Sequence, residues 1–95
     1  MQADYKVLGR VLVSNHRFRI LTLLTDRMMT PTQMSRRLDL ELSHVSRTLK
    51  ELESLGLIEC KNPEIRKGKL YATSEYGKKT LESLKRIVNE GEVNK

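Results

Sequence analysis

The chain of 95 residues contains little of what several classes of protein require. Its single cysteine, Cys60, cannot build a disulfide framework, which favours a reducing compartment and predicts a cytoplasmic protein. No apolar run approaches the roughly 20 residues of a membrane span. The N-terminus also lacks the charged start and apolar stretch of a signal peptide. We therefore expect no membrane partner.

Groups suited to catalysis are equally scarce. The chain has two histidines, no tryptophan and no glycine-rich loop, and no nucleophile–base set or carboxylate pair stands out. His16, His44 and Cys60 share no metal-ligand spacing. One phenylalanine and three tyrosines offer few stacking platforms for RNA bases. We expect neither an enzyme nor a cofactor or metal site.

Positive charge is what the chain has in excess. Eighteen Lys and Arg stand against twelve Asp and Glu, which leaves a net charge of +6. This excess favours an anionic partner; a membrane surface fits it as well as nucleic acid does, but nucleic acid is the partner expected here. Apolar residues make up 38%, enough for one small folded domain over residues 1–95 with its centre at 14–80.

Apolar spacing predicts two helices before Pro31. The first covers residues 4–13 with one apolar stripe, and the second covers about 16–25, is apolar on most sides and is capped by Ser14. Thr30 and Gln33 then form a capping-box pattern around Pro31, which predicts a short helix over 31–38.

A tight turn at Asp39 precedes a longer helix, which Ser43 caps and Gly56 ends. The apolar side chains of this helix, Val45, Leu49 and Leu52, lie on one face. The opposite face and its flanks hold Ser43, His44, Ser46, Arg47, Lys50 and Ser54. One side of the helix is therefore available to a partner.

The pattern after Gly56 is extended. Residues 57–61 and 70–73 predict a two-stranded hairpin with the cationic tip Arg66-Lys67-Gly68-Lys69, and Ser74 caps a final helix over 75–90. The predicted fold is α+β, mostly α: a winged helix-turn-helix with a two-stranded β wing and flanking N- and C-terminal helices.

In this arrangement the second helix of the turn can enter a DNA major groove while the hairpin reaches the phosphates. We expect double-stranded DNA as the partner, bound without covalent chemistry. The expected DNA-binding residues are Thr32, Gln33, Arg36, Ser43, His44, Ser46, Arg47, Lys50, Arg66, Lys67 and Lys69.

Simpler interpretations exist for several of these residues. Arg47 and His44 fit an ordinary solvated helix face, and Lys50 is within reach of an ion pair with Glu53. The wing cations fit protection of a hairpin edge. Cys60 fits a small buried apolar residue.

Four segments carry a family resemblance. Residues 42–52 read LSHVSRTLKEL and are followed by LGLI at 55–58, with ILTLL at 20–24 and LYATSEYG at 70–77. Over about 14–80 the chain resembles the ArsR- and MarR-like winged-helix transcription regulators. The resemblance implies a homodimeric, sequence-specific repressor or activator on palindromic DNA, with the outer helices as the dimer contact. The residues expected there are Leu8, Val11, Leu12, Leu81, Leu84 and Val88, because the core of one small domain cannot easily cover the apolar stripes of both outer helices. The alternative is that these stripes belong to the core of a monomer.

The chain departs from these regulators at two places. Residues 38–42 read LDLEL, without the cysteine pair of the metal-sensing members, so a metal effector is not expected. Thr73 replaces a customary leucine, which we expect to affect local packing only. The alternative to a regulator is a winged-helix module for protein interaction or architecture that binds nucleic acid without sequence preference.

Overall fold

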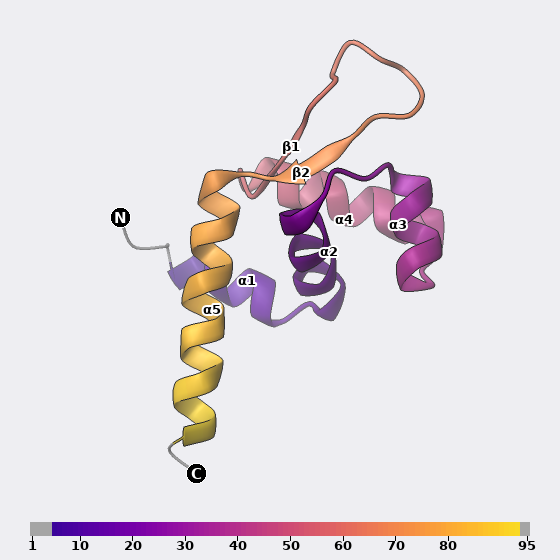
Figure 1. Ribbon diagram of the computed structural model, residues 1–95. Helices are drawn as coiled ribbons and strands as arrows, with labels where there is room; N and C mark the ends of the chain where they lie inside the picture. Colours follow the sequence, from indigo (N-terminus) through magenta and orange to yellow (C-terminus); the bar gives the residue numbers. More distant parts are fainter. Residues whose placement is uncertain (1–4, 94–95) are drawn as a thin grey trace.

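The computed structural model describes residues 5–93, and along 88–93 it describes the path of the helix alone. The elements in this part of the chain are α1 (Tyr5–Leu12), α2 (Asn15–Asp26), α3 (Pro31–Leu38), α4 (Leu42–Ser54), β1 (Ile58–Cys60), β2 (Tyr71–Thr73) and α5 (Glu75–Val93). Figure 1 shows α3 and α4 side by side and the wing extending beyond β1 and β2. The predicted winged helix-turn-helix fold is confirmed.

Local signals set most of the helix ends. Ser14 Oγ accepts a hydrogen bond from the Arg17 N–H at the start of α2, as predicted. Thr30 and Gln33 form both bonds of a capping box at the start of α3. Asp39 ends α3 in the left-handed conformation with φ 55°, the conformation expected for the tight turn.

The predicted cap of α4 is wrong. This helix begins at Leu42, and its N-cap Glu41 makes no side-chain capping bond. The turn after Asp39 is closed at Leu40, whose N–H donates to the Ser35 carbonyl, and it therefore ends before the predicted cap Ser43. The Glu41 carbonyl then accepts the first helical bond from the Val45 N–H, so Ser43 lies inside the first turn.

The wing begins with an antiparallel pair in which Ile58, Glu59 and Cys60 face Thr73, Ala72 and Tyr71. A third segment joins it. Met29, in the link between α2 and α3, exchanges both backbone hydrogen bonds with Tyr71. This bridge ties the base of the wing to the helix-turn-helix, and no local sequence pattern predicted it.

The core surrounds α2. Its buried apolar residues are Leu8, Val11, Ile20, Leu21, Leu24, Met29, Met34, Val45, Leu49, Leu52, Leu57, Ile58, Leu81 and Leu84. Thr73 is buried among them and donates through Oγ1 to the Leu21 carbonyl at 2.8 Å. Thr73 therefore does more than local packing, since it links β2 to α2.

The outer helices belong to this core. Leu8, Val11, Leu81 and Leu84 are at most 4% exposed in a single copy, because α1 packs on α2 and α5. The premise that one domain cannot cover the two apolar stripes is therefore wrong. Leu12 is exposed and stays a predicted dimer contact, whereas the Val88 side chain lies outside the described residues.

The last helix, α5, is longer than the predicted 75–90. It reaches Val93, and its ribbon extends past the other helices (Figure 1). Within residues 5–93, none of the helices has the length and apolar character needed to cross a bilayer.

Candidate nucleic-acid interface

The exposed face of α4 is the centre of the candidate interface. Val45, Leu49 and Leu52 are buried as predicted, and Thr48 extends this buried face. The predicted contact residues on the opposite side and its flanks, Ser43, His44, Ser46, Arg47 and Lys50, are all exposed. Among the described residues Arg47 and Lys50 have no ion-pair or hydrogen-bond partner, so Lys50 does not pair with Glu53. Their charges are free for a ligand.

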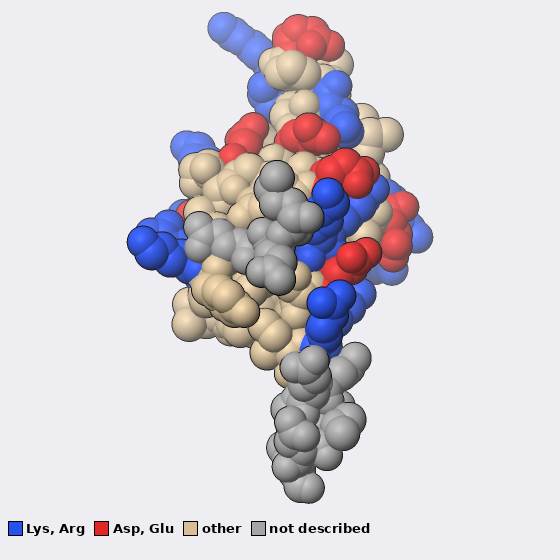
Figure 2. Space-filling model, turned by 90° about the vertical axis from the view of Figure 1, so that its left-hand side faces the viewer, with Lys and Arg blue, Asp and Glu red and all other residues tan. Residues whose placement is uncertain are grey.

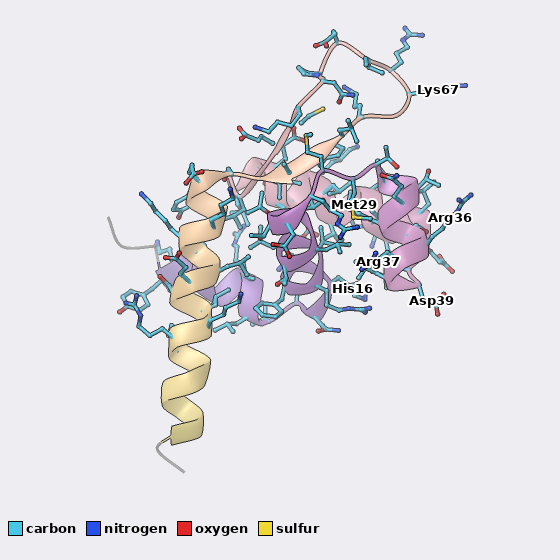
Figure 3. The ribbon with its side chains drawn as sticks, viewed as in Figure 1. His16, Met29, Arg36, Arg37, Asp39 and Lys67 are labelled. Atoms are coloured by element: carbon cyan, nitrogen blue, oxygen red, sulfur yellow. The ribbon has the colours of Figure 1, made fainter. Side chains whose placement is uncertain are left out.

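Helix α3 adds a second row of polar side chains. Thr32, Gln33 and Arg36 are exposed, and Arg36 extends outward from α3 (Figure 3). The Gln33 Oε1 already accepts the Thr30 N–H at 2.9 Å. Only the amide N–H₂ group of Gln33 is therefore available to a partner without breaking the cap.

The wing loop has a polar scaffold of its own. Asn62 accepts the Leu70 N–H at 2.7 Å and donates to the Gly68 carbonyl at 3.2 Å, which closes the loop. Lys69 Nζ donates to the Pro63 carbonyl at 3.0 Å. Sequence reasoning missed Asn62, although an Asn at a strand end is a common turn former.

Two of the three wing cations are fully available. Arg66 and Lys67 are exposed without a partner among the described residues, while Lys69 is half-buried. Lys67 and Arg36 extend toward the same side of the molecule (Figure 3). The loop tip and α3 can therefore contact one large ligand together.

A groove of about 450 Å³ separates the wing from the start of α3 and α4. Its lining residues are Thr30, Pro31, Thr32, Leu42, Ser46, Arg66, Lys67, Gly68, Lys69 and Tyr71. Five of the predicted contact residues meet in this groove, namely Thr32, Ser46, Arg66, Lys67 and Lys69. Hydroxyl groups line one side and cations the other, a combination suited to phosphate oxygens.

Tyr71 forms part of the groove wall beside β1. Burial raises the pKa of the Tyr71 hydroxyl above its ordinary value, and the nearby Glu53 and Cys60 raise it further. The hydroxyl therefore stays protonated at neutral pH.

The other flank of α4 contacts the start of α2. The His16 and His44 rings lie 5.7 Å apart between centroids, and Arg17 forms an ion pair with Glu51. These long-range contacts had no signal in the sequence pattern. The exposed face of α4 is thus bounded by the wing groove on one side and by α2 on the other.

Charge is distributed differently on the opposite side of the molecule. The face shown in Figure 2 includes α5 and carries Asp and Glu interleaved with Lys and Arg. A polyanion meets both signs of charge there. The predicted contact residues on α3, α4 and the wing tip are cationic or neutral, with the exposed Asp39, Glu41 and Glu64 beside them.

Cys60 is half-buried rather than fully buried, and its thiol lies 3.5 Å from Asn62 Oδ1. Among the described residues, no group of three or more His, Cys, Asp and Glu side chains is placed to hold a metal ion.

Two adjacent helices joined by a tight turn and followed by a β wing define a winged-helix DNA-binding domain. The chain belongs to the family described as a helix-turn-helix domain, which matches residues 12–61. Together with the solved structures described next, the family and the fold are those of winged-helix, DNA-binding transcription regulators, a class of proteins that are not enzymes. A comparison with curated proteins gives no match.

Solved structures of regulators are similar over most of the chain. Reduced HlyU from Vibrio cholerae has 27% identity and a TM-score of 0.71, over 87% of this chain and 86% of that one. A MarR-family regulator from Neisseria meningitidis has 29% identity and a TM-score of 0.68, over 90% of this chain. Another MarR-family transcription regulator has 25% identity and a TM-score of 0.73, over 92% of this chain. The matches cover 61% and 58% of these two longer proteins.

Proposed function

We propose that the protein regulates transcription as a homodimer that binds a specific, palindromic duplex site. Helix α4 enters the major groove, and the wing contacts the phosphate backbone beside it. The observation that carries this proposal is the unpartnered face of α4, with Arg47 at its centre and the cationic wing groove along one flank.

Base reading is assigned to the first turns of α4. The major groove is wide enough for an α-helix, and the N-terminal residues of the inserted helix meet the base edges. Arg47 has the fork geometry for two hydrogen bonds to a guanine edge, worth roughly 1–3 kcal/mol of discrimination. Ser43, His44 and Ser46 are the other candidates for base contact.

Affinity is assigned to the cations around α4. Lys50, Arg36, Arg66 and Lys67 are exposed and neutralise phosphates, which releases counterions and strengthens binding to any sequence. The groove between the wing and α3 is the proposed path of the backbone, since Thr32 and Ser46 supply hydroxyl donors there. These contacts fix the register in which Arg47 meets the bases.

The dimer is assigned to the outer helices, in agreement with the regulators that the sequence resembles. Exposed apolar side chains lie at the two ends of α1, with Tyr5 at one end and Leu12 and Val13 at the other. Ile87 on α5 is also exposed, although the buried leucines of the same helix are not. Two-fold pairing over these side chains would present two α4 helices to one duplex.

Selection of bound fragments from a random duplex library tests the proposal. We expect an inverted repeat to be enriched, and we expect Arg47→Ala to relax the preference at one base pair in each half-site while the fold survives. Arg47 is exposed, so the substitution removes no core contact.

Arg37→Ala is the matched control, because Arg37 is also an exposed arginine and is not among the predicted contacts. Binding of all fragments alike by the unmodified protein would instead identify an architectural or protein-interaction module. Uniform loss of affinity in Arg47→Ala would make Arg47 a phosphate contact.

A further inference from the structure

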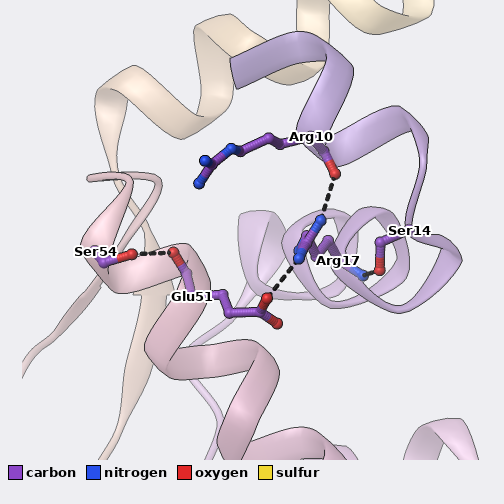
Figure 4. Close-up of polar contacts among 5 residues, drawn as sticks. All are labelled: Arg10, Ser14, Arg17, Glu51 and Ser54. Carbon is purple, nitrogen blue, oxygen red and sulfur yellow. Dashed lines mark hydrogen bonds and ion pairs between the residues drawn. The ribbon is translucent and has the colours of Figure 1, made fainter. Parts of the chain in front are cut away.

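Arg17 connects three helices on the flank of α4 that faces α2 (Figure 4). Its Nη1 donates to the Arg10 carbonyl in α1 at 2.8 Å, and its Nη2 donates to Glu51 Oε2 in α4 at 2.5 Å. The backbone N–H of Arg17 is itself fixed by Ser14 Oγ. The guanidinium group is thus held in one orientation, directed at the Glu51 carboxylate of α4.

The ion pair is partly shielded from solvent, and Arg17 is shielded more than Glu51. The Arg17 side chain is 20% exposed and that of Glu51 is 40% exposed. Such a pair is stronger than a fully exposed one, because water screens it less. Glu51 is therefore kept against α2, where its negative charge is neutralised.

Glu51 is also a neighbour of Arg47 on α4. Side chains four residues apart lie on the same face of a helix and attract each other when their charges are opposite. Arg47 is exposed and has no partner among the described residues. If Arg17 did not hold Glu51, this carboxylate would be free to pair with Arg47 and to repel phosphates.

We propose that Arg17 is a positioning residue for DNA recognition: it holds the Glu51 carboxylate on the α2 flank and thereby keeps Arg47 free for the duplex. The proposal rests on the function proposed above, because it requires Arg47 to contact DNA. It goes further by assigning control of the Glu51 charge to a residue outside α4, namely one arginine of α2.

The test compares Arg17→Gln, Glu51→Gln and the double variant. Arg19→Gln is the matched control, since Arg19 lies two residues away in α2 and donates to a backbone carbonyl, that of Leu38 at 3.1 Å. It loses the same charge without releasing a carboxylate. Each variant is measured for its affinity to the selected duplex and to random duplex at one salt concentration, and its folding is checked by thermal unfolding.

We expect Arg17→Gln to weaken binding to the selected duplex by roughly three- to tenfold relative to Arg19→Gln, with a smaller effect on random duplex. The double variant should return to within about twofold of the unmodified protein, because the freed carboxylate is absent. Glu51→Gln alone should not weaken binding. In an Arg47→Ala background, Arg17→Gln should cause no further loss of sequence preference.

A different pattern overturns the proposal. If Glu51→Gln weakens binding as much as Arg17→Gln and the double variant stays weak, the ion pair acts as a scaffold only. Should Arg17→Gln fail to fold, Glu51→Gln decides alone, since any loss of preference contradicts the proposal. If the unmodified protein shows no preference, the proposed function fails and this inference with it. If Arg47→Ala relaxes the preference but the Arg17 series has no effect, this inference alone fails.

Discussion

Gly77 allows the first turn of α5 to lie directly against the chain that leads into β1. A Cβ atom at this position would lie 2.1 Å from the Leu57 carbonyl oxygen and 2.6 Å from Thr73 Cγ2. The Leu57 carbonyl cannot move away freely, because it accepts the Ser74 N–H at 3.0 Å. The glycine of the LYATSEYG segment is therefore required by a close backbone approach.

Gly77→Ala is expected to lower the free energy of unfolding by roughly 1–3 kcal/mol, the usual cost of overpacking. Each kcal/mol corresponds to about 4–8 °C in Tm for a domain of this size, so a thermal melt detects the change. Gly9→Ala is the matched control: Gly9 also lies in a helix, but a Cβ there meets nothing within 4 Å. The control should be neutral or stabilising by about 0.5–1 kcal/mol. Equal Tm values for both variants would contradict the close approach.

Among the elements, the wing is the one whose contribution to DNA binding is best measured through the salt dependence of the affinity. Its loop is closed by Asn62, and its tip presents Arg66 and Lys67 without partners among the described residues. Lys69 differs from them, because its ammonium group already donates to the Pro63 carbonyl. The three cations are therefore not equivalent, although the sequence shows them as one cluster.

We expect Arg66→Ala and Lys67→Ala to weaken binding to every duplex alike. Each variant should flatten the slope of log affinity against log salt concentration by about one unit, because one phosphate contact is lost. Lys79→Ala, an exposed lysine of α5, should leave the slope unchanged. An unchanged slope in the Arg66→Ala/Lys67→Ala double variant would exclude the wing from the interface.

The elements also show which parts of the structure could be predicted from sequence. The capping box of α3, the left-handed Asp39 and the left-handed Gly56 after α4 depend on a few neighbouring residues, and these predictions are confirmed. Helix α4 itself ends at Ser54, two residues before Gly56. The start of α4 was misplaced at Ser43, because no side chain caps this helix and its first bond comes from a turn that closes early.

Contacts between distant residues had no local pattern to reveal them. The Met29–Tyr71 bridge and the ion pair of Arg17 with Glu51 join elements that are far apart in the chain. The groove beside the wing likewise exists only once the loop is folded next to α3 and α4. The predicted contact residues themselves stay predictions, and the structure adds which of them are close to one another.

At the scale of the whole molecule, the predicted DNA contacts and the outer helices occupy two different sides of the fold (Figure 1). The α3, α4 and wing-tip side carries Arg36, Arg47, Lys50, Arg66 and Lys67 without partners among the described residues, beside the exposed Asp39, Glu41 and Glu64. Acidic and basic residues also alternate on the side that includes α5 (Figure 2). This second side carries the outer helices and their exposed apolar side chains.

The burial of Leu84 changes which substitution tests the dimer. Leu84 is fully buried in one copy, so Leu84→Glu would place a charge in the core and unfold the protein instead of separating subunits. Leu12 and Val13 are better targets, because they are 48% and 82% exposed at the end of α1. A charge at these positions leaves the core intact and blocks only an apolar contact between copies.

We expect the unmodified protein to sediment as a dimer at tens of micromolar and Leu12→Glu/Val13→Asp to sediment as a folded monomer. Ile65→Glu is the control for sedimentation alone, because Ile65 is 43% exposed in the wing loop, at the opposite end of the fold from α1 (Figure 1), and its new charge lies beside the proposed phosphate contact Arg66. The monomeric variant should lose most of its affinity for the palindrome but keep its affinity for a single half-site. Two-fold pairing also predicts half-sites about one helical turn, or roughly 10 bp, apart. The dimer is contradicted if the unmodified protein is a monomer and selects a site that is not a palindrome. In that case one helix-turn-helix would bind each site alone.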